Sequence, residues 1–112
     1  MPEIQKNLKD LKRLRESISS YLPVTHSLIP MDILLTVYCG DDHGLDLTIK
    51  SLFASLPYSD MGIRHHFKKL LSENWIELHN GDKDSRLKRV RATEKLKQNL
   101  IKLDNEIKDL FE

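Results

Sequence analysis

The fold is decided by residues 58–91, which read YSDMGIRHHFKKLLSENWIELHNGDKDSRLKRVR. A helix is expected over residues 59–74, because Ser59 is a good N-cap and an apolar stripe with helical spacing follows it. Apolar side chains at positions i, i+4 and i+7 share one face of a helix and are expected to pack inward. In this helix they are Ile63, Phe67 and Leu70.

The opposite face of the same helix is basic and nearly free of carboxylates. At 100° per residue, its side chains point away from the apolar face. Such a face alone is equally compatible with an ordinary solvated helix surface, but here a basic hairpin follows it directly. The residues of this helix predicted to contact DNA are Ser59, Met61, Gly62, Arg64, His65, Lys68 and Lys69. Nearby phosphates would favour protonated His65, so binding is expected to strengthen modestly below neutral pH.

A β-hairpin with a long polar tip is expected after this helix. Residues 75–78 and 87–92 are strand candidates, and residues 79–86 form a glycine-containing loop between them. A helix fits the major groove of DNA, while a neighbouring hairpin tip reaches phosphates or the minor groove, whose negative potential attracts arginine. The hairpin residues predicted to contact DNA are Lys83, Asp84, Arg86, Lys88 and Arg89.

Three elements are expected upstream of this stretch. Residues 30–38 form an apolar central helix that ends at residues 39–40, and residues 45–47 alternate like a short strand. Thr48 is a suitable N-cap for a short helix, which Pro57 breaks before the next helix begins. Two helices are therefore joined by a tight turn.

One domain accounts for the 112 residues, since this length and a hydrophobic content of 39% suffice for one modest core. The expected order of elements is that of a winged helix-turn-helix domain, so the fold class is mainly α with a small β-hairpin. Residues 28–92 form the core of this domain. Residues 1–22 and 93–112 are expected to be dimerisation helices.

The wing carries a sequence motif. Residues 84–95, DSRLKRVRATEK, resemble the wing of the MarR family of winged-helix transcriptional regulators, D-x-R-x-x-x-V-x-L-T-x-x-G. The matching residues are Asp84, Arg86, Val90 and Thr93. This resemblance, which covers residues 28–96, implies that Asp84 orients the wing and that Arg86 enters the minor groove. It also implies that residues 59–69 read the major groove.

Both ends of the chain carry apolar stripes with the 4,3 spacing of a helical seam. Together they would expose more apolar surface than one small domain covers easily, so a homodimer is expected. Two-fold pairing would place two recognition helices about 34 Å apart and predicts a pseudo-palindromic DNA site. The residues predicted to form the dimer are Ile4, Leu8, Leu11, Ile18, Leu100, Leu103, Ile107 and Leu110.

Charge is distributed unevenly along the chain. Between Gly62 and Arg91, eight basic and four acidic side chains give a net charge of +4, whereas the whole chain carries +1 and the remainder therefore −3. Such asymmetry points to a polyanionic partner.

Several classes of function are disfavoured. No phosphate-cradling glycine loop, nucleophile with an adjacent base, or metal set occurs, so neither an enzyme nor a cofactor is expected. The pair His65-His66 is a poor metal site, since adjacent helical side chains point about 100° apart. Cys39 is expected to be a small buried residue rather than a redox sensor. With no apolar run long enough for a bilayer and a lone cysteine, the protein is expected in the cytoplasm.

The sequence thus predicts a sequence-specific regulator of transcription that binds double-stranded DNA as a dimer. It favours a repressor but does not fix the sign of regulation. Its expected partners are duplex DNA and a second copy of the chain, with no membrane; a small-molecule effector stays open. The alternative is a winged-helix module for protein–protein interaction that binds DNA weakly or not at all. Loss of DNA affinity on removal of the wing arginine would separate the two.

Overall fold

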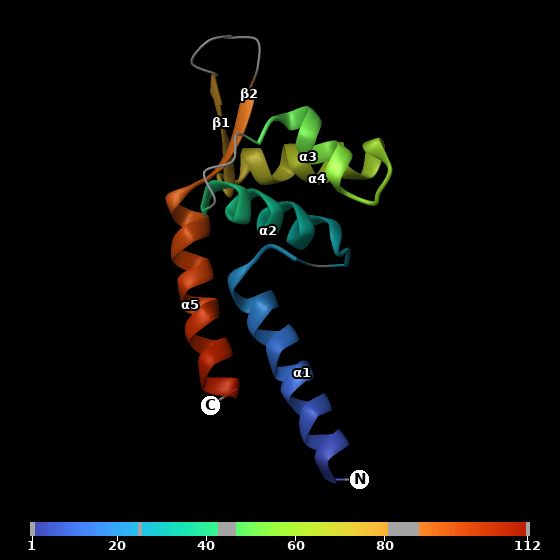
Figure 1. Cartoon of the computed structure of the whole chain (residues 1–112), viewed down its shortest axis with the longest axis vertical. Helices are drawn as coiled ribbons and strands as arrows, with labels where there is room; N and C mark the ends of the chain where they lie inside the picture. Colours follow the sequence, from blue (N-terminus) through green and yellow to red (C-terminus); the bar gives the residue numbers. More distant parts are fainter. Residues whose placement is uncertain (1, 25, 43–46, 81–87, 112) are drawn as a thin grey trace.

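The computed structural model describes residues 2–24, 26–42, 47–80 and 88–111. Within these ranges the chain forms five helices and a two-stranded antiparallel sheet (Figure 1). In chain order the elements are α1 (Pro2–Tyr21), α2 (Ile29–Asp42), α3 (Ile49–Ser55), α4 (Asp60–Ser72), β1 (Ile76–Asn80), β2 (Lys88–Ala92) and α5 (Glu94–Phe111). This is a winged helix-turn-helix, so the predicted fold class is confirmed.

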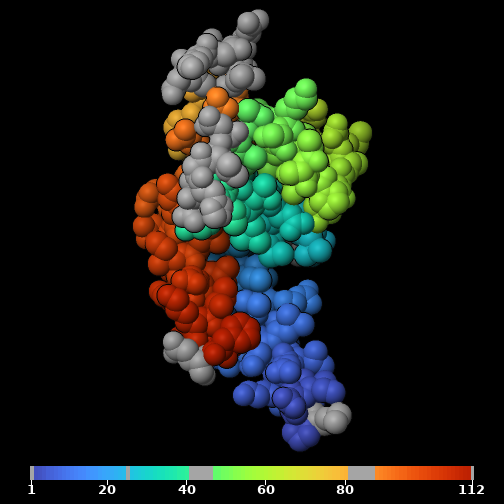
Figure 2. Space-filling view, in the orientation of Figure 1, coloured from blue at the N-terminus to red at the C-terminus, as the bar shows by residue number. Residues whose placement is uncertain are grey.

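The molecule is elongated, with extents of 56 × 27 × 22 Å. α2, α3, α4 and the hairpin form one end, and α1 and α5 run side by side toward the other (Figure 1). The N-terminal end of α1 protrudes beyond the C-terminal end of α5 (Figure 2). Among the helices in the described ranges, none combines the length and hydropathy that a bilayer crossing requires.

Both predicted N-caps of the helix-turn-helix are present. The Thr48 hydroxyl accepts from the Ser51 amide at 3.1 Å while the Ser51 hydroxyl accepts from the Thr48 amide at 3.0 Å, which is a capping box. The Ser59 hydroxyl accepts from the Gly62 amide at 3.2 Å at the start of α4. Between the two helices, Leu56 is extended because it precedes a proline.

The end of α4 is tied to the base of the hairpin. Asn74 adopts a left-handed conformation with φ of 64°, and the Trp75 amide donates back to the Leu70 carbonyl at 3.0 Å. Across the hairpin, the Thr93 hydroxyl donates to the Asn74 carbonyl at 2.6 Å and accepts from the Leu96 amide at 3.3 Å. One side chain therefore both closes the wing and starts α5.

β1 and β2 pair from Ile76 opposite Ala92 to Asn80 opposite Lys88. The Leu47 carbonyl accepts from the Val90 amide at 2.8 Å, so the segment before α3 lies along the other edge of β2. Leu47 belongs to the short strand predicted over residues 45–47, whose other two positions lie outside the described residues. These pairings fix the root of the wing against α3.

A single hydrophobic core joins the elements. Its members come from α2, α3, α4, both strands and α5, and this explains how elements far apart in the sequence hold the hairpin beside α4. The largest fully buried side chains are Ile33, Leu34, Val37, Leu52, Ile63, Ile76, Val90 and Leu96.

Two expectations for the central helix are wrong. α2 continues to Asp42 instead of ending at residues 39–40, because one glycine inside a helix costs only about 1 kcal/mol and does not outweigh burial of the apolar face. Cys39 is exposed rather than buried. It lies four residues after Leu35, which is 41% exposed, so the two share the outer face of α2.

The terminal helices pair within one chain. Leu103 of α5 is buried in the core. The half-buried Ile18, Leu100 and Ile107 pack against this core. Part of the stripe predicted to bind a second copy therefore faces its own chain, because α1 folds back along α5. Leu103, predicted as a dimer contact, is only 6% exposed and belongs to the core of its own chain.

A polar cluster secures this helix pair. The Ser17 and Tyr21 hydroxyls of α1 donate to the two Glu106 carboxylate oxygens of α5, at 2.5 and 2.6 Å. The Ser17 and Tyr21 hydrogen bonds lower the pKa of the Glu106 carboxyl, with a smaller contribution from Arg13. α1 has no buried residue, so these bonds and the half-buried apolar contacts hold it to α5.

Candidate nucleic-acid interface

α4 presents its predicted inner face to the core and its predicted outer face to solvent. Ile63, Phe67 and Leu70 are buried. Phe67 meets Phe53 of α3 in an edge-to-face contact with ring centroids 5.5 Å apart. The Tyr58 hydroxyl, in the turn before α4, donates to the Asp32 carboxylate of α2 and so anchors the turn. This hydrogen bond, burial and the Asp32 charge raise the pKa of Tyr58.

The basic side chains on the outer face of α4 are exposed. Arg64, Lys68 and Lys69 have no carboxylate within ion-pair distance among the described residues. Met61 beside them is 83% exposed. Free cations and one apolar side chain on an open helix suit phosphate and base-edge contacts in a major groove.

Two of the predicted contact residues have structural roles in α4. Ser59 caps the helix. A Cβ atom on Gly62 would lie 3.3 Å from Ile29 Cδ1 and 3.3 Å from Ser59 Oγ, so glycine here permits the close approach of α2. We therefore assign Gly62 a packing role. The Ser59 hydroxyl accepts a hydrogen bond as the cap, and its own proton can still be donated to a bound group.

The two adjacent histidines differ in environment. His65 is exposed and His66 is half-buried, with ring centroids 5.1 Å apart. Burial, followed by the charges of His65 and Lys69, lowers the pKa of His66. The neutral form of His66 is therefore favoured, and the exposed His65 is the histidine open to a phosphate. Among the described residues there is no cluster of three or more His, Cys, Asp or Glu that would hold a metal.

The described part of the wing is its base, the paired strands β1 and β2, which we call the wing root. Lys88 is exposed, and its ammonium donates to the Asn80 side chain at 2.6 Å, which leaves further donors for a phosphate. Arg89 is half-buried beside Thr48, with which it pairs across the strand edge. The predicted contacts Lys83, Asp84 and Arg86 lie outside the described residues.

The structure brings α4, α3 and the wing root around one hollow of about 820 Å³. Arg64, Lys68 and Lys88, all predicted from the sequence, line it together. Lys50 of α3 joins them and was missed by the sequence reasoning. Its only signal in the sequence is its place two residues after the Thr48 cap, on the polar side of a short helix.

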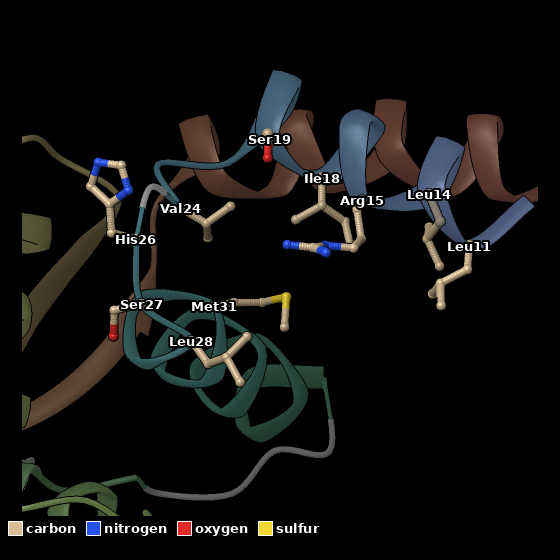
Figure 3. Close-up of a pocket in the computed structure, with 10 residues that line it drawn as sticks. All are labelled: Leu11, Leu14, Arg15, Ile18, Ser19, Val24, His26, Ser27, Leu28 and Met31. Atoms are coloured by element: carbon tan, nitrogen blue, oxygen red, sulfur yellow. The ribbon is translucent and has the colours of Figure 1, made fainter. Parts of the chain in front are cut away.

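A second cavity, of about 540 Å³, lies between α1, the segment after it and the start of α2 (Figure 3). Its wall is mainly apolar, with Ile18 of α1 pointing toward Met31 of α2. Arg15 supplies a guanidinium to the same space (Figure 3). This cavity is separate from the basic hollow beside α4, with which it shares no residue.

No protein-family model and no curated protein matches the sequence. Solved structures do match the fold over almost the whole chain. A mutant of S. aureus MepR matches with a TM-score of 0.69 at 13% identity, over 97% of this chain and 74% of that one. The multiple antibiotic resistance repressor MarR matches with a TM-score of 0.64 at 20% identity, over 94% and 72%.

A third solved structure is S. aureus MepR bound to ethidium bromide, with a TM-score of 0.65 at 13% identity, over 89% of this chain and 73% of that one. At these identities the likeness establishes the fold. The MarR-type architecture that the wing motif predicted is therefore confirmed.

Proposed function

We propose that this chain, which has the fold of MarR-type transcriptional regulators, is itself a sequence-specific regulator that binds duplex DNA as a homodimer. α4 would lie in the major groove, and the hairpin would contact the neighbouring backbone or minor groove. A dimer bound over a promoter would exclude polymerase, which supports repression as the sign of regulation, and one matching structure is named a repressor.

The unpaired cations on α4 carry this proposal. Arg64, Lys68 and Lys69 are exposed on the outer face of α4, and Lys88 extends the same basic surface to the wing root. Cations that only keep a protein soluble would not need to gather on one continuous surface. Phosphates spaced along a duplex backbone would neutralise them and release counterions.

The wing tip completes the interface in this proposal. By resemblance to the MarR wing motif, Arg86 enters the minor groove and Asp84 orients the wing, with Lys83 on the backbone. The described roles of Val90 and Thr93 support this reading of the motif, since Val90 is buried and Thr93 closes the hairpin base.

The dimer would form through the part of α1 that α5 leaves uncovered. Ile4, Leu8 and Leu11 are 54%, 59% and 52% exposed, and their spacing puts them on one face of the N-terminal half of α1. A second copy packed there would bury this stripe. Four half-buried side chains would lie at the edge of the contact: Ile18, Leu100, Ile107 and, at the end of α5, Leu110.

A small-molecule effector would find a cavity of suitable size between α1 and α2. MepR was solved with ethidium, a cation, whereas Arg15 in this cavity favours a neutral or anionic compound. An effector bound beside Arg15 in this cavity would therefore differ in charge from ethidium.

A selection from random duplexes tests the proposal directly. We expect enrichment of a two-fold-symmetric motif whose half-sites lie about one helical turn apart. Binding to that motif should weaken steeply with salt, and Arg86→Ala should weaken it further while Lys102→Gln, on α5, should not. Absence of any duplex binding at low salt would instead favour the alternative, a winged-helix protein-interaction module.

A further inference from the structure

A third and smaller hollow lies along α4, on the other side from the basic hollow. It measures about 310 Å³ and is bounded by α4, the segment that joins α1 to α2, and the start of α2. The two hollows share no residue. At about 100° per residue from Ser72, Lys69 and His66 of the smaller hollow fall on one side of the outer face. Lys68 and Arg64 of the basic hollow fall on the other side.

Three histidines line this smaller hollow, which we call the histidine hollow. His65 and His66 come from α4, and His26 comes from the segment before α2. The His26 ring points away from Leu28 and Met31 of the apolar cavity (Figure 3). His26 and His65 are both exposed. Packing of the joining segment against α4 thus places two exposed imidazoles around one hollow.

The other charged groups that line the histidine hollow are Lys69 of α4 and Glu73 at its C-cap. Lys95 of α5 is a neighbour, since its ammonium donates to the Glu73 backbone carbonyl at 2.9 Å. Among the residues that the structure describes, His26, His65 and Lys69 form no ion pair. The net charge of this hollow therefore depends on how many of its histidines are protonated.

Two further polar side chains give the hollow hydrogen-bonding capacity without charge. His66 is half-buried, and its lowered pKa favours the neutral imidazole, whose ring N–H remains a donor. The Ser27 hydroxyl accepts from the Ile29 amide at 3.1 Å, and its own proton can still be donated to a bound group. Hydrogen-bond donors beside cations are the groups that contact phosphate oxygens.

We propose that the histidine hollow holds a backbone phosphate of the bound duplex, which His26 and His65 contact in their protonated forms. The major groove is about 12 Å wide, so a helix within it has one phosphate backbone on each side. The lysines and arginine of the basic hollow would contact one backbone, and the histidine hollow would contact the other. This inference rests on the proposed function and adds to the interface a segment outside the helix-turn-helix.

The two sides of the interface would respond differently to pH. Lysine and arginine stay charged near neutrality, whereas histidine changes its charge there. A nearby phosphate favours the protonated imidazole, so duplex binding would take up protons and affinity would rise as the pH falls. Each histidine that becomes a charged contact would also steepen the slope of log K against log salt by about 0.9.

Duplex affinity at pH 8 and pH 6, on either side of the usual histidine pKa of about 6.5, tests the inference. The symmetric duplex from the selection is used at constant ionic strength in buffers without phosphate. Wild type should bind more tightly at pH 6. His26→Gln should match wild type at pH 8 and bind about two- to fivefold more weakly per half-site at pH 6.

His26→Lys separates charge from structure at this position. It carries a positive charge at both pH values, so it should bind the duplex more tightly than wild type at pH 8 and show a smaller change between pH 8 and pH 6. The salt slope gives a second readout. On going from pH 8 to pH 6 it should steepen less in His26→Gln than in wild type, by up to about 0.9 per half-site.

His79→Gln is the matched control. His79 is an exposed histidine on β1, with its imidazole 2.9 Å from the Glu77 carboxylate and outside the histidine hollow. This variant should leave both the affinity and its pH dependence unchanged. Thermal unfolding at each pH confirms that every variant folds.

The outcomes separate this inference from the proposed function. If the duplex binds equally at both pH values, or if His26→Gln has the same effect at both, the inference fails and the proposed function stands. Loss of the pH dependence in His79→Gln but not in His26→Gln would place the titrating group on the hairpin and overturn the inference. If no duplex binds at either pH, the proposed function fails and this inference fails with it.

Discussion

Lys68 lies at the centre of the basic surface, exposed on α4 and lining the hollow that α3 and the wing root share. Single residues differ in how far their surroundings define their role. Lys68 has no ion-pair partner among the described residues, whereas Thr93 has three hydrogen-bonding neighbours around one hydroxyl. The first is available to a partner, and the second is committed to the fold.

Lys68→Gln should weaken duplex binding without changing stability. Because a phosphate contact releases about one counterion, we expect the slope of log K against log salt to become shallower by about 0.9. Fluorescence anisotropy at several salt concentrations measures this slope. Lys97→Gln, which removes an exposed cation from α5, is the matched control. Equal slopes for the two variants would exclude Lys68 from the interface.

Thr93→Ala should destabilise the fold by about 1–2 kcal/mol, since it removes the N-cap of α5 and the bond to the Asn74 carbonyl. For a domain of this size, each kcal/mol corresponds to about 4–8 °C in Tm. Thermal unfolding followed by circular dichroism measures the loss. Thr93→Ser retains the hydroxyl and should recover most of the stability; no recovery would mean that the methyl group and not the hydroxyl matters.

At the scale of elements, α1 depends on α5. It contributes no buried residue, and its polar attachment is Glu106 with Ser17 and Tyr21. α4 is the opposite case, because its apolar face is buried against α2 and α3 and its turn is anchored to Asp32. α4 is thus fixed by buried contacts, whereas α1 is held by half-buried and polar contacts.

The attachment of α1 should depend on pH. The pKa of Glu106 is lowered in the folded chain, so its ionised form stabilises the fold above the unfolded value of about 4.5. This contribution is lost as the pH falls through the lower folded value. Unfolding temperatures measured from pH 7 to pH 3 should therefore show wild type above Glu106→Gln at neutral pH and the two converging in acid. A constant difference across this range would contradict the assignment.

The whole molecule is asymmetric in its exposed surface. α3, α4 and the strands lie at one end, and the N-terminal end of α1 lies at the other (Figures 1 and 2). The basic hollow is lined by residues of the first end, and the exposed apolar stripe of α1 belongs to the second. A dimer through the stripe would leave both basic ends free. This arrangement is what two half-sites on one duplex require.

Leu8→Glu should convert the proposed dimer into a monomer, since it places a charge in the middle of the stripe. Light scattering gives the mass, and the loss of one half-site should weaken binding to a two-fold-symmetric duplex by at least tenfold. Lys9→Glu adds a negative charge at an exposed neighbouring position and should leave the dimer intact. A wild-type chain that scatters as a monomer at micromolar concentration would exclude this interface.

Local signals in the sequence determined the helix-turn-helix and the hairpin. Thr48 and Ser59 cap helices, Pro57 ends one, and the spacing of Ile63 and Phe67 sets the inner face of α4, all through contacts within a few residues. Local signals could not decide what the apolar stripes of the terminal helices pack against. A 4,3 stripe has the same pattern whether it packs on its own chain or on a second copy.

Only the tertiary structure decided how those faces are used. Burial of Leu103 and exposure of Leu8 depend on how α1 folds back along α5, and the exposure of Cys39 depends on which side of α2 the core occupies. The hollow that brings Lys50 to Lys68 and Lys88 likewise joins three elements separated in the chain. Local chemistry within residues 58–91 thus specifies α4 and the hairpin that follows it, while long-range packing sets which surfaces remain open to a partner.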